Sequence, residues 1–173
     1  MAGSAPLTNH WFNLWHGTDR ASAQNIIKAG VLATPPRPGL DFGPGFYLTS
    51  KKSQAQAWAN IRAMIKSEPP ALVGFVVFHA DLSLLRQVSF IRSDRSANEF
   101  WSFVRDMKGG THTHHFDTGY YDFVCGPVTR KPKYFDAYPD SDQFSFHGER
   151  GTEFINSCQK RLEYANGSIR FGP

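Results

Sequence analysis

Three short segments of the sequence carry groups suited to binding a ligand. His16, Gly17 and Thr18 end an aromatic-rich segment, Tyr47 follows two closely spaced glycines, and Gln143 opens a segment of alternating apolar residues. An imidazole or an amide can donate and accept hydrogen bonds, and glycines let the backbone approach another group closely. Each residue alone also has an ordinary structural role, because a tyrosine in a strand usually packs in the core.

Several familiar catalytic patterns are incomplete. Residues 41–43 read Asp-Phe-Gly, but the other motifs of a protein kinase are missing, as is the Gly-x-Ser-x-Gly of a hydrolase. A zinc site usually takes its ligands at helix or turn spacing together with a thiolate or carboxylate. The His/Thr cluster at 111–115 is therefore interpreted as an exposed polar loop, and no metal site is expected.

Hydrophobic patterning predicts the elements that must position these residues. Strands are expected over WFNLWHGT (ending at His16), FYLT (46–49), ALVGFVVFHA (71–80), VSFIR (88–92), GYYDFVCGPV (119–128) and QFSFH (143–147). Helices are expected over residues 19–30, 50–68 and 96–110, and residues 151–165 read as a last helix or a strand-then-helix mixture. Strands and helices do not alternate regularly, so α+β is the predicted class.

Caps and apolar faces support the helices. Asp19 can cap the first helix and Gly30 can end it, while Ser96 and Glu99 form a capping box for the third. The second helix is expected to place one set of side chains on one face. These are Ala55, Trp58, Ala59, Arg62 and Ile65.

Length and charge limit the function classes. The 173 residues predict one domain, 1–173, with flexible tails at 1–11 and 166–173. A net charge of +4 would help a polyanion approach, but a solvated basic helix face is the favoured explanation of this modest excess. No apolar run approaches the roughly 18 residues needed to cross a bilayer, and no secretory signal is visible. A cytoplasmic protein without a membrane partner is therefore expected, with Cys125 and Cys158 reduced.

The order and spacing of the motifs resemble the diphtheria-toxin-like, or H-Y-E, branch of the ADP-ribosyltransferases. In that branch HGT or HGS ends the first strand, G-x-G-[IF]-Y follows a proline-rich loop, a second aromatic lies eleven residues later, and a glutamate opens a late strand. LWHGT, FGPGFYLTSKKSQAQAW and QFSFH match in this order. The chain is most similar to a family of small stand-alone proteins sharing the motifs at 41–49, 101–104 and 121–128. The similarity is strong over 14–59 and moderate over 96–155.

This resemblance implies an ADP-ribosyltransferase-like fold, with a split, mostly antiparallel sheet and flanking helices, and NAD as co-substrate. The residues implied in NAD binding are His16, Gly17, Thr18, Phe42, Gly43, Tyr47 and Trp58. The residues implied in catalysis are His16, Tyr47 and Gln143.

By the same resemblance, each residue type meets one need of NAD. Tyr47 and Trp58 would stack on the nicotinamide ring, and the backbone of Gly17 would pair with its carboxamide. His16 and Thr18 would reach the adenosine ribose hydroxyls. Phe42 and Gly43 belong to the loop expected to cover the dinucleotide.

Two positions depart from the family pattern. Gln143 replaces a glutamate whose charge stabilises the oxocarbenium-like transition state, and losing one such interaction costs about 2.7–4 kcal/mol elsewhere. Ala55 replaces a serine that contacts the carboxamide. Glu149 or Glu153 is a less favoured source of the missing carboxylate.

Three activities therefore remain open. The favoured hypothesis is a mono-ADP-ribosyltransferase whose acceptor, a protein or a nucleic acid, is not identified. The others are an NAD glycohydrolase and a module that binds NAD or ADP-ribose without turnover. The sequence does not give the oligomeric state.

Overall fold

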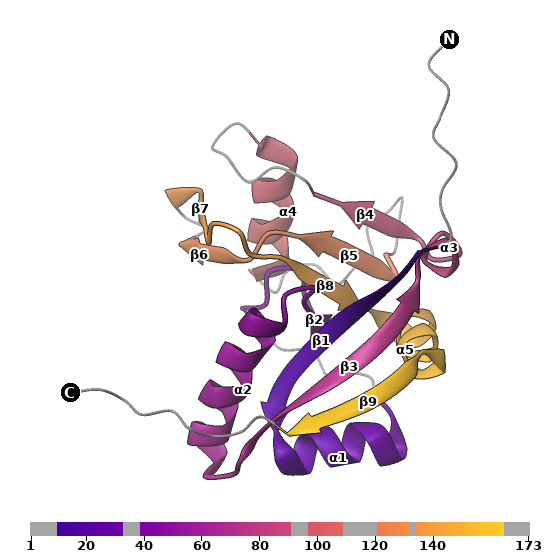
Figure 1. The fold of residues 1–173 in the computed structure, drawn as a ribbon. Helices are drawn as coiled ribbons and strands as arrows, with labels where there is room; N and C mark the ends of the chain where they lie inside the picture. The colour runs from indigo at the N-terminus through magenta and orange to yellow at the C-terminus, as the bar shows by residue number, and fades with distance from the viewer. Residues whose placement is uncertain (1–9, 33–38, 91–96, 109–120, 132–133, 165–173) are drawn as a thin grey trace, which may run out of the picture.

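The computed structural model describes residues 10–32, 39–90, 97–108, 121–131 and 134–164. They form two β-sheets that pack against each other, with helices around them (Figure 1). The predicted α+β class and the mostly antiparallel sheets are confirmed.

The first sheet is antiparallel in the order β1-β3-β9. Its strands are β1 (Trp11–Asp19), β3 (Pro70–Phe78) and β9 (Gln159–Tyr164). The second sheet has the order β2-β8-β5-β4, in which only β4 and β5 run parallel. Its strands are β2 (Phe46–Leu48), β8 (Gln143–Phe146), β5 (Phe123–Gly126) and β4 (Gln87–Ser89). A small ribbon joins β6 (Thr129–Lys131) to β7 (Asp136–Ala137).

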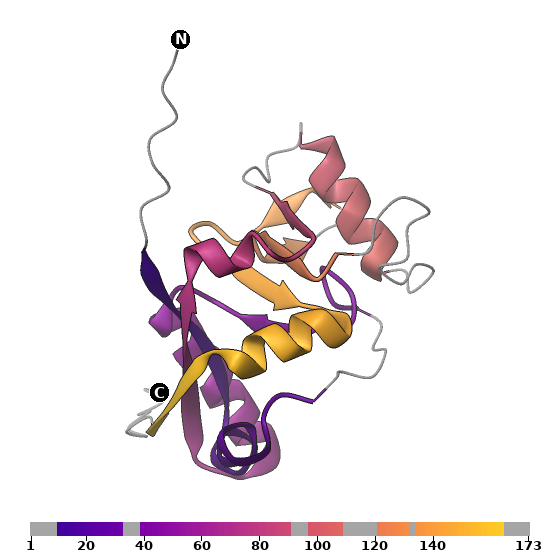
Figure 2. The same cartoon turned by 90° about the vertical axis from the view of Figure 1, so that its right-hand side faces the viewer.

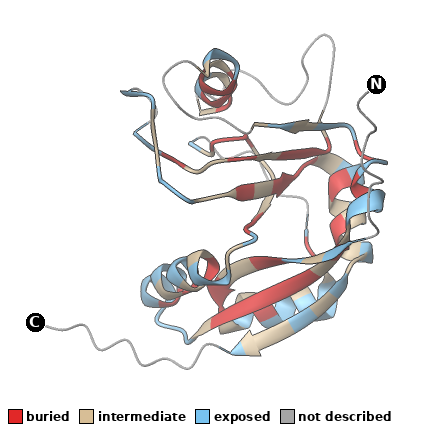
Figure 3. Cartoon of the chain, turned by 45° about the horizontal axis from the view of Figure 1, so that its top comes forward, coloured by how far each residue is buried: buried red, intermediate tan, exposed pale blue. Residues whose placement is uncertain are grey.

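The main core lies between the two sheets. Leu14, Val73 and Phe75 of the first sheet pack in one cluster with Phe123 and Phe146 of the second. Helices α1 (Arg20–Ala29) and α5 (Gly148–Ser157) contribute Ala23 and Ile155 to this cluster. Burial is concentrated along the facing strands (Figure 3), which fixes the position of one sheet on the other.

Helix α2 (Lys52–Lys66) lies very close to β1 because both elements have small residues where they meet. A Cβ at Gly17 would lie 1.8 Å from the carbonyl oxygen of Ala55, so only glycine allows this approach. The buried face of α2 consists of Ala55, Ala59 and Ala63. The expected apolar face was therefore wrong in part, since Trp58 is 50% exposed and Ile65 is 67% exposed.

The second sheet has its own small core on the face away from the first sheet. Helix α4 (Asn98–Lys108) buries Phe100, Trp101 and Val104 there, together with Phe42 of the loop before β2. Tyr47 packs against the edge of this cluster. The loop before β2 is thereby held between the sheet and α4.

The predicted elements are mostly present, with differences at their ends. β1 extends three residues beyond His16, and the last segment is helix α5 followed directly by β9 (Figure 2), the reverse of the strand-then-helix alternative. β6, β7 and the short helix α3 (His79–Leu82) were not expected. Trp11, which the expected strand and the expected tail both included, begins β1. The structure does not describe residues 1–9 and 166–173 of the expected tails, nor Ser96 and the His/Thr cluster at 111–115.

The two cysteines do not form a disulfide. Both are free thiols, and burial raises the pKa of Cys125 and raises that of Cys158 to about 11. Within the described ranges, every helix is too short or too polar to cross a lipid bilayer.

Asp19 provides a first test of the fold. Its side chain accepts hydrogen bonds from the backbone N–H and hydroxyl of Ser22 and pairs with Lys66 at 3.0 Å. Burial alone would raise the pKa of Asp19, but these contacts outweigh it and the pKa is lowered. Replacing an N-cap residue with alanine typically costs about 0.5–2 kcal/mol, so Asp19→Ala should lower the free energy of unfolding by that amount at pH 7.

The effect should depend on pH with a definite sign. A lowered carboxyl pKa stabilises the fold above the unfolded value of about 3.9, and this contribution is lost as the pH falls through the folded value. Urea unfolding at pH 7 and near pH 3 should show the gap between wild type and Asp19→Ala shrinking in acid. Asp81→Ala, at an exposed carboxylate, serves as control; an equal loss in both variants would contradict the capping role.

Candidate active site

β1 and β2 are joined by one pair of backbone hydrogen bonds and then separate. Trp15 N–H donates to Thr49 O at 2.8 Å, and Thr49 N–H donates to Trp15 O at 2.9 Å. In a continuing antiparallel ladder, Gly17 and Tyr47 would form the next pair on this side. They do not pair in the described chain. We call the opening between Gly17 and Tyr47 the strand split.

The backbone of Gly17 is directed into the strand split. N–H and C=O groups alternate sides along a strand, and those of Trp15 point toward β2, so those of Gly17 do as well. In the described part of the chain, neither group of Gly17 has a hydrogen-bond partner across this edge. An adjacent donor and acceptor on one residue are therefore available to a ligand.

His16 bridges the two strands at this point. Its Nδ1 lies 2.9 Å from the carbonyl oxygen of Tyr47, and since a carbonyl carries no hydrogen, Nδ1 is the protonated nitrogen. The ring packs 4.4 Å from that of Phe46. Burial, with a contribution from the charge of Arg62, lowers the pKa of His16 despite this hydrogen bond. The imidazole is therefore neutral near pH 7, and Nε2, which has no partner among the described residues, is an acceptor.

Tyr47 is held rigidly by its own loop. The hydroxyl donates to Gly43 O at 2.7 Å and accepts from Phe42 N–H at 3.0 Å. Its ring stacks on the fully buried ring of Phe42 at 6.4 Å, and burial raises the pKa of the phenol, which stays neutral. Phe42 and Gly43 thus hold the side chain of Tyr47 in place. The ring of Phe42 is fully buried and is not exposed to a ligand.

The glycines before Tyr47 have reasons within the protein itself. Gly43 adopts φ 78°, which strains other residues. A Cβ at Gly45 would lie 2.5 Å from Nδ1 of His147, whose ring is buried between Pro44 O and the Ser145 hydroxyl. Close approach to a ligand is not needed to explain either glycine.

Gln143 lies on the same face of the second sheet as Tyr47. Tyr47 pairs with Ser145, so Gln143 is its diagonal neighbour on β8, at about 7–8 Å. The amide nitrogen Nε2 donates to Asp41 Oδ2 at 2.8 Å and to Pro127 O at 3.0 Å. The amide oxygen Oε1 has no hydrogen-bond partner within the described residues and is not among the buried unpaired atoms, so solvent reaches it.

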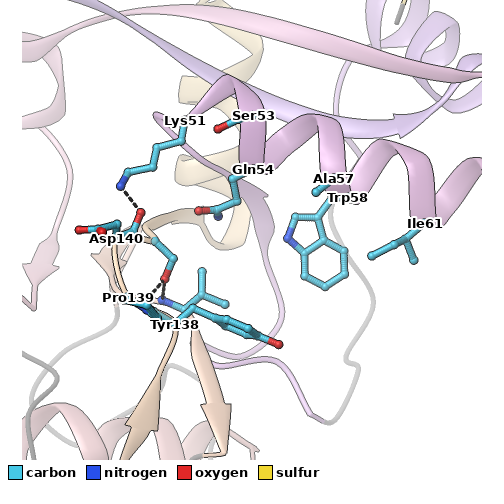
Figure 4. Close-up of a pocket in the computed structure, with 11 residues that line it drawn as sticks. Lys51, Ser53, Gln54, Ala57, Trp58, Ile61, Tyr138, Pro139 and Asp140 are labelled. Atoms are coloured by element: carbon cyan, nitrogen blue, oxygen red, sulfur yellow. Dashed lines mark hydrogen bonds between the residues drawn. The ribbon is translucent and has the colours of Figure 1, made fainter. Parts of the chain in front are cut away.

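Thr18 and Trp58 occupy different surroundings. The hydroxyl of Thr18 is buried and directed at Asp19, with an oxygen–oxygen distance of 3.3 Å. Trp58 lies on a cavity of about 460 Å³ between α2 and the segment that precedes β8 (Figure 4). Tyr47 is not among the residues lining this cavity, so the two aromatic rings do not face one enclosed space in this structure.

The cavity nevertheless lies beside Gln143. Its lining includes Ser141, two residues before Gln143, and Val128, next to the Pro127 carbonyl that Gln143 contacts. Gln54, also on the cavity, donates to Asp142 O at 2.6 Å. Aromatic and apolar groups from Trp58, Ile61, Tyr138 and Pro139 form the opposite walls.

Glu149 and Glu153 are exposed on α5, beyond the end of β8 opposite to Gln143, and Ala55 is buried against Gly17. In the described ranges, no three His, Cys, Asp or Glu side chains gather as metal ligands would. Sequence reasoning gave Asp41 no role, although it opens the motif at 41–49, because its partners Thr129 and Gln143 lie 88 and 102 residues away.

The lowered pKa of His16 predicts a pH effect on stability. Below the unfolded pKa of about 6.5, the unfolded chain binds a proton that the folded imidazole does not. The free energy of unfolding therefore decreases as the pH is lowered from about 6.5, and this contribution does not change above that pH. His16→Gln should remove this component. Urea unfolding at pH 7.5 and 5.5 should show a smaller loss in the variant than in wild type. His79→Gln, at an exposed histidine, is the control; equal losses in wild type and His16→Gln would contradict the assignment.

Tyr47→Phe tests the rigidity of the loop. Removing the hydroxyl deletes its two hydrogen bonds, to Gly43 O and from Phe42 N–H, which should cost about 1–3 kcal/mol of unfolding free energy. Chemical denaturation measures this cost directly. Tyr138→Phe, at a half-exposed tyrosine on the cavity, should change stability by less than about 0.5 kcal/mol. A neutral Tyr47→Phe would show that the ring alone positions the loop.

The described chain is thus an α+β domain in which two sheets separate beside a neutral histidine, an unpaired glycine backbone and an oriented amide. A family model with the description "Protein of unknown function (DUF3990)" matches residues 12–150, and the chain belongs to this family. The matched stretch contains His16, Tyr47 and Gln143. A comparison with curated proteins finds no match.

Proposed function

We propose that this protein is an NAD-dependent mono-ADP-ribosyltransferase that uses the strand split. The observation that carries the proposal is the unpaired backbone edge of Gly17 facing Tyr47, beyond the single bridge between Trp15 and Thr49. A carboxamide needs one acceptor and one donor side by side, and Gly17 offers a matching N–H and C=O.

The unpaired groups around Gly17 match the rest of such a ligand. His16 Nε2 and Gln143 Oε1 are both acceptors, and ribose hydroxyls are donors. A ring bound at Gly17 would lie beside Tyr47, and stacking on one aromatic ring contributes roughly 0.5–1.5 kcal/mol. Trp58 instead lines the neighbouring cavity.

In the proposed reaction the bond between nicotinamide and its ribose breaks, and its electron pair leaves with nicotinamide. The acceptor nucleophile then forms a bond to the same ribose carbon and loses a proton. Gln143 would hold the ribose hydroxyl through Oε1 but supplies no negative charge. We therefore expect slow transfer of a single ADP-ribose rather than chain elongation.

The acceptor would approach from the cavity beside Gln143. This cavity combines apolar walls with the exposed indole of Trp58, and a protein or a nucleic-acid acceptor fits that description equally well. The activity is tested by incubating the protein with labelled NAD and candidate acceptors of both kinds, while free nicotinamide is measured.

Transfer of label should depend on the strand split. His16→Ala removes one acceptor for a ribose hydroxyl, so it should weaken NAD binding by roughly tenfold while leaving the fold intact. His10→Ala, at an exposed histidine outside the split, should bind NAD as wild type does. Calorimetry with NAD measures both variants.

The outcomes separate the competing activities. Nicotinamide and free ADP-ribose released at equal rates, without labelled acceptor, would identify an NAD glycohydrolase. NAD binding without release of nicotinamide over hours would identify a binding module. No NAD binding by a folded protein would overturn the proposal.

A further inference from the structure

Asp41 is a buried carboxylate that joins four segments of the chain. Oδ2 accepts from Thr129 N–H at 2.7 Å and from Gln143 Nε2 at 2.8 Å. Oδ1 accepts from the Thr129 hydroxyl at 2.6 Å and pairs with Lys108 at 2.8 Å. All four partners are donors, so both oxygens of Asp41 act as acceptors.

This arrangement leaves the Gln143 amide only one orientation. Its two N–H hydrogens meet the carboxylate of Asp41 and the carbonyl of Pro127, and neither of those groups can donate. Turning the amide over would place Oε1 against both oxygens. The nitrogen is therefore fixed inward, and Oε1 is the amide atom without a hydrogen-bond partner among the described residues.

The same contacts are unfavourable for a glutamate at this position. A carboxylate at residue 143 would direct an oxygen toward Asp41 Oδ2 and Pro127 O, where a donor is required. Two carboxylates so close cannot both stay ionised without a large penalty. The residue that the ADP-ribosyltransferase pattern would place at 143 is thus disfavoured by Asp41.

We propose that Asp41 is a positioning residue that selects glutamine at residue 143 and aims its Oε1 at the ligand. The site is then built for an uncharged acceptor, rather than being a glutamate site that has lost its charge. The catalytic meaning of this pairing rests on the proposed function, whereas the pairing itself does not.

A double-mutant cycle tests the pairing without any ligand. Gln143→Glu should lower the melting temperature at pH 7.5 by about 6–12 °C, because a buried charge is left unpaired next to Asp41. Asp41→Asn in the same chain supplies an amide N–H toward the introduced carboxylate and keeps an oxygen for the Thr129 hydroxyl, but Thr129 N–H loses its acceptor. The double variant should therefore lose less melting temperature than the sum of the two single losses.

The pH dependence adds a second readout. Charged or titratable groups near position 143 are Asp41, Lys108, Asp142, Cys125 and the Tyr47 phenol. In Gln143→Glu, repulsion from Asp41 raises the pKa of the introduced carboxyl above its unfolded value of about 4.3, so its protonated form is tolerated in acid and its penalty grows as the pH rises. The deficit of Gln143→Glu should be smaller at pH 5.5 than at pH 7.5. Gln159→Glu, at an exposed position on β9, should show no such trend.

The measurements show whether Asp41 and residue 143 depend on each other. The proposal would be overturned if the melting-temperature changes of the two single variants add up in the double variant. It would also be overturned if the loss of melting temperature in Gln143→Glu does not change with pH. A folded, fully stable Gln143→Glu protein at pH 7.5 would do the same, since it would show that Asp41 does not select the amide.

Nicotinamide release provides the catalytic arm. Because a contact to the ribose hydroxyl matters most in the transition state, Asp41→Asn should lower kcat by roughly tenfold and change KM little. Coupling in the cycle without NAD turnover in wild type would reject the proposed function and keep the pairing. NAD turnover without coupling would reject the pairing and keep the function.

Discussion

The paired hydrogen bonds between Trp15 and Thr49 join the edges of the two sheets and also mark where they part. If the ladder continued by one more pair, Gly17 and Tyr47 would satisfy each other and no backbone group would be left for a ligand. If this pair were missing, His16 would not reach the Tyr47 carbonyl. One bridge therefore both connects the sheets and opens the strand split.

Close packing around the bridge keeps the split in one geometry. Helix α2 touches Gly17 through the backbone of Ala55, and the Tyr47 hydroxyl is held by the loop that Asp41 anchors. Rigid supports of this kind are what a binding site needs, since mobile groups must be ordered each time a ligand binds. The alanines of α2 are as important here as the polar residues, because a larger side chain would move the helix away from β1.

The sequence predicts local elements of this fold better than its long-range contacts. Helix α1 begins after Asp19 and ends at Gly30, as their capping chemistry indicates. The buried face of α2 was not predictable in the same way, because it depends on contact with Gly17 of β1. Hydrophobic periodicity describes one helix and does not identify the element that packs against it. His16, Tyr47 and Gln143 were found as a pattern, but the tautomer of His16 and the direction of the Gln143 amide depend on partners 31 and 102 residues away.

The contacts of Asp41 also have a consequence for folding. They close chain loops of 88 residues to Thr129 and 102 residues to Gln143, and contacts of this length form after local ones because the chain must first lose much of its entropy. A partly folded chain that has already formed α1 or α2 still lacks a correctly aimed Oε1. A molecule that binds there recognises only the completed protein and draws the folding equilibrium toward it by mass action.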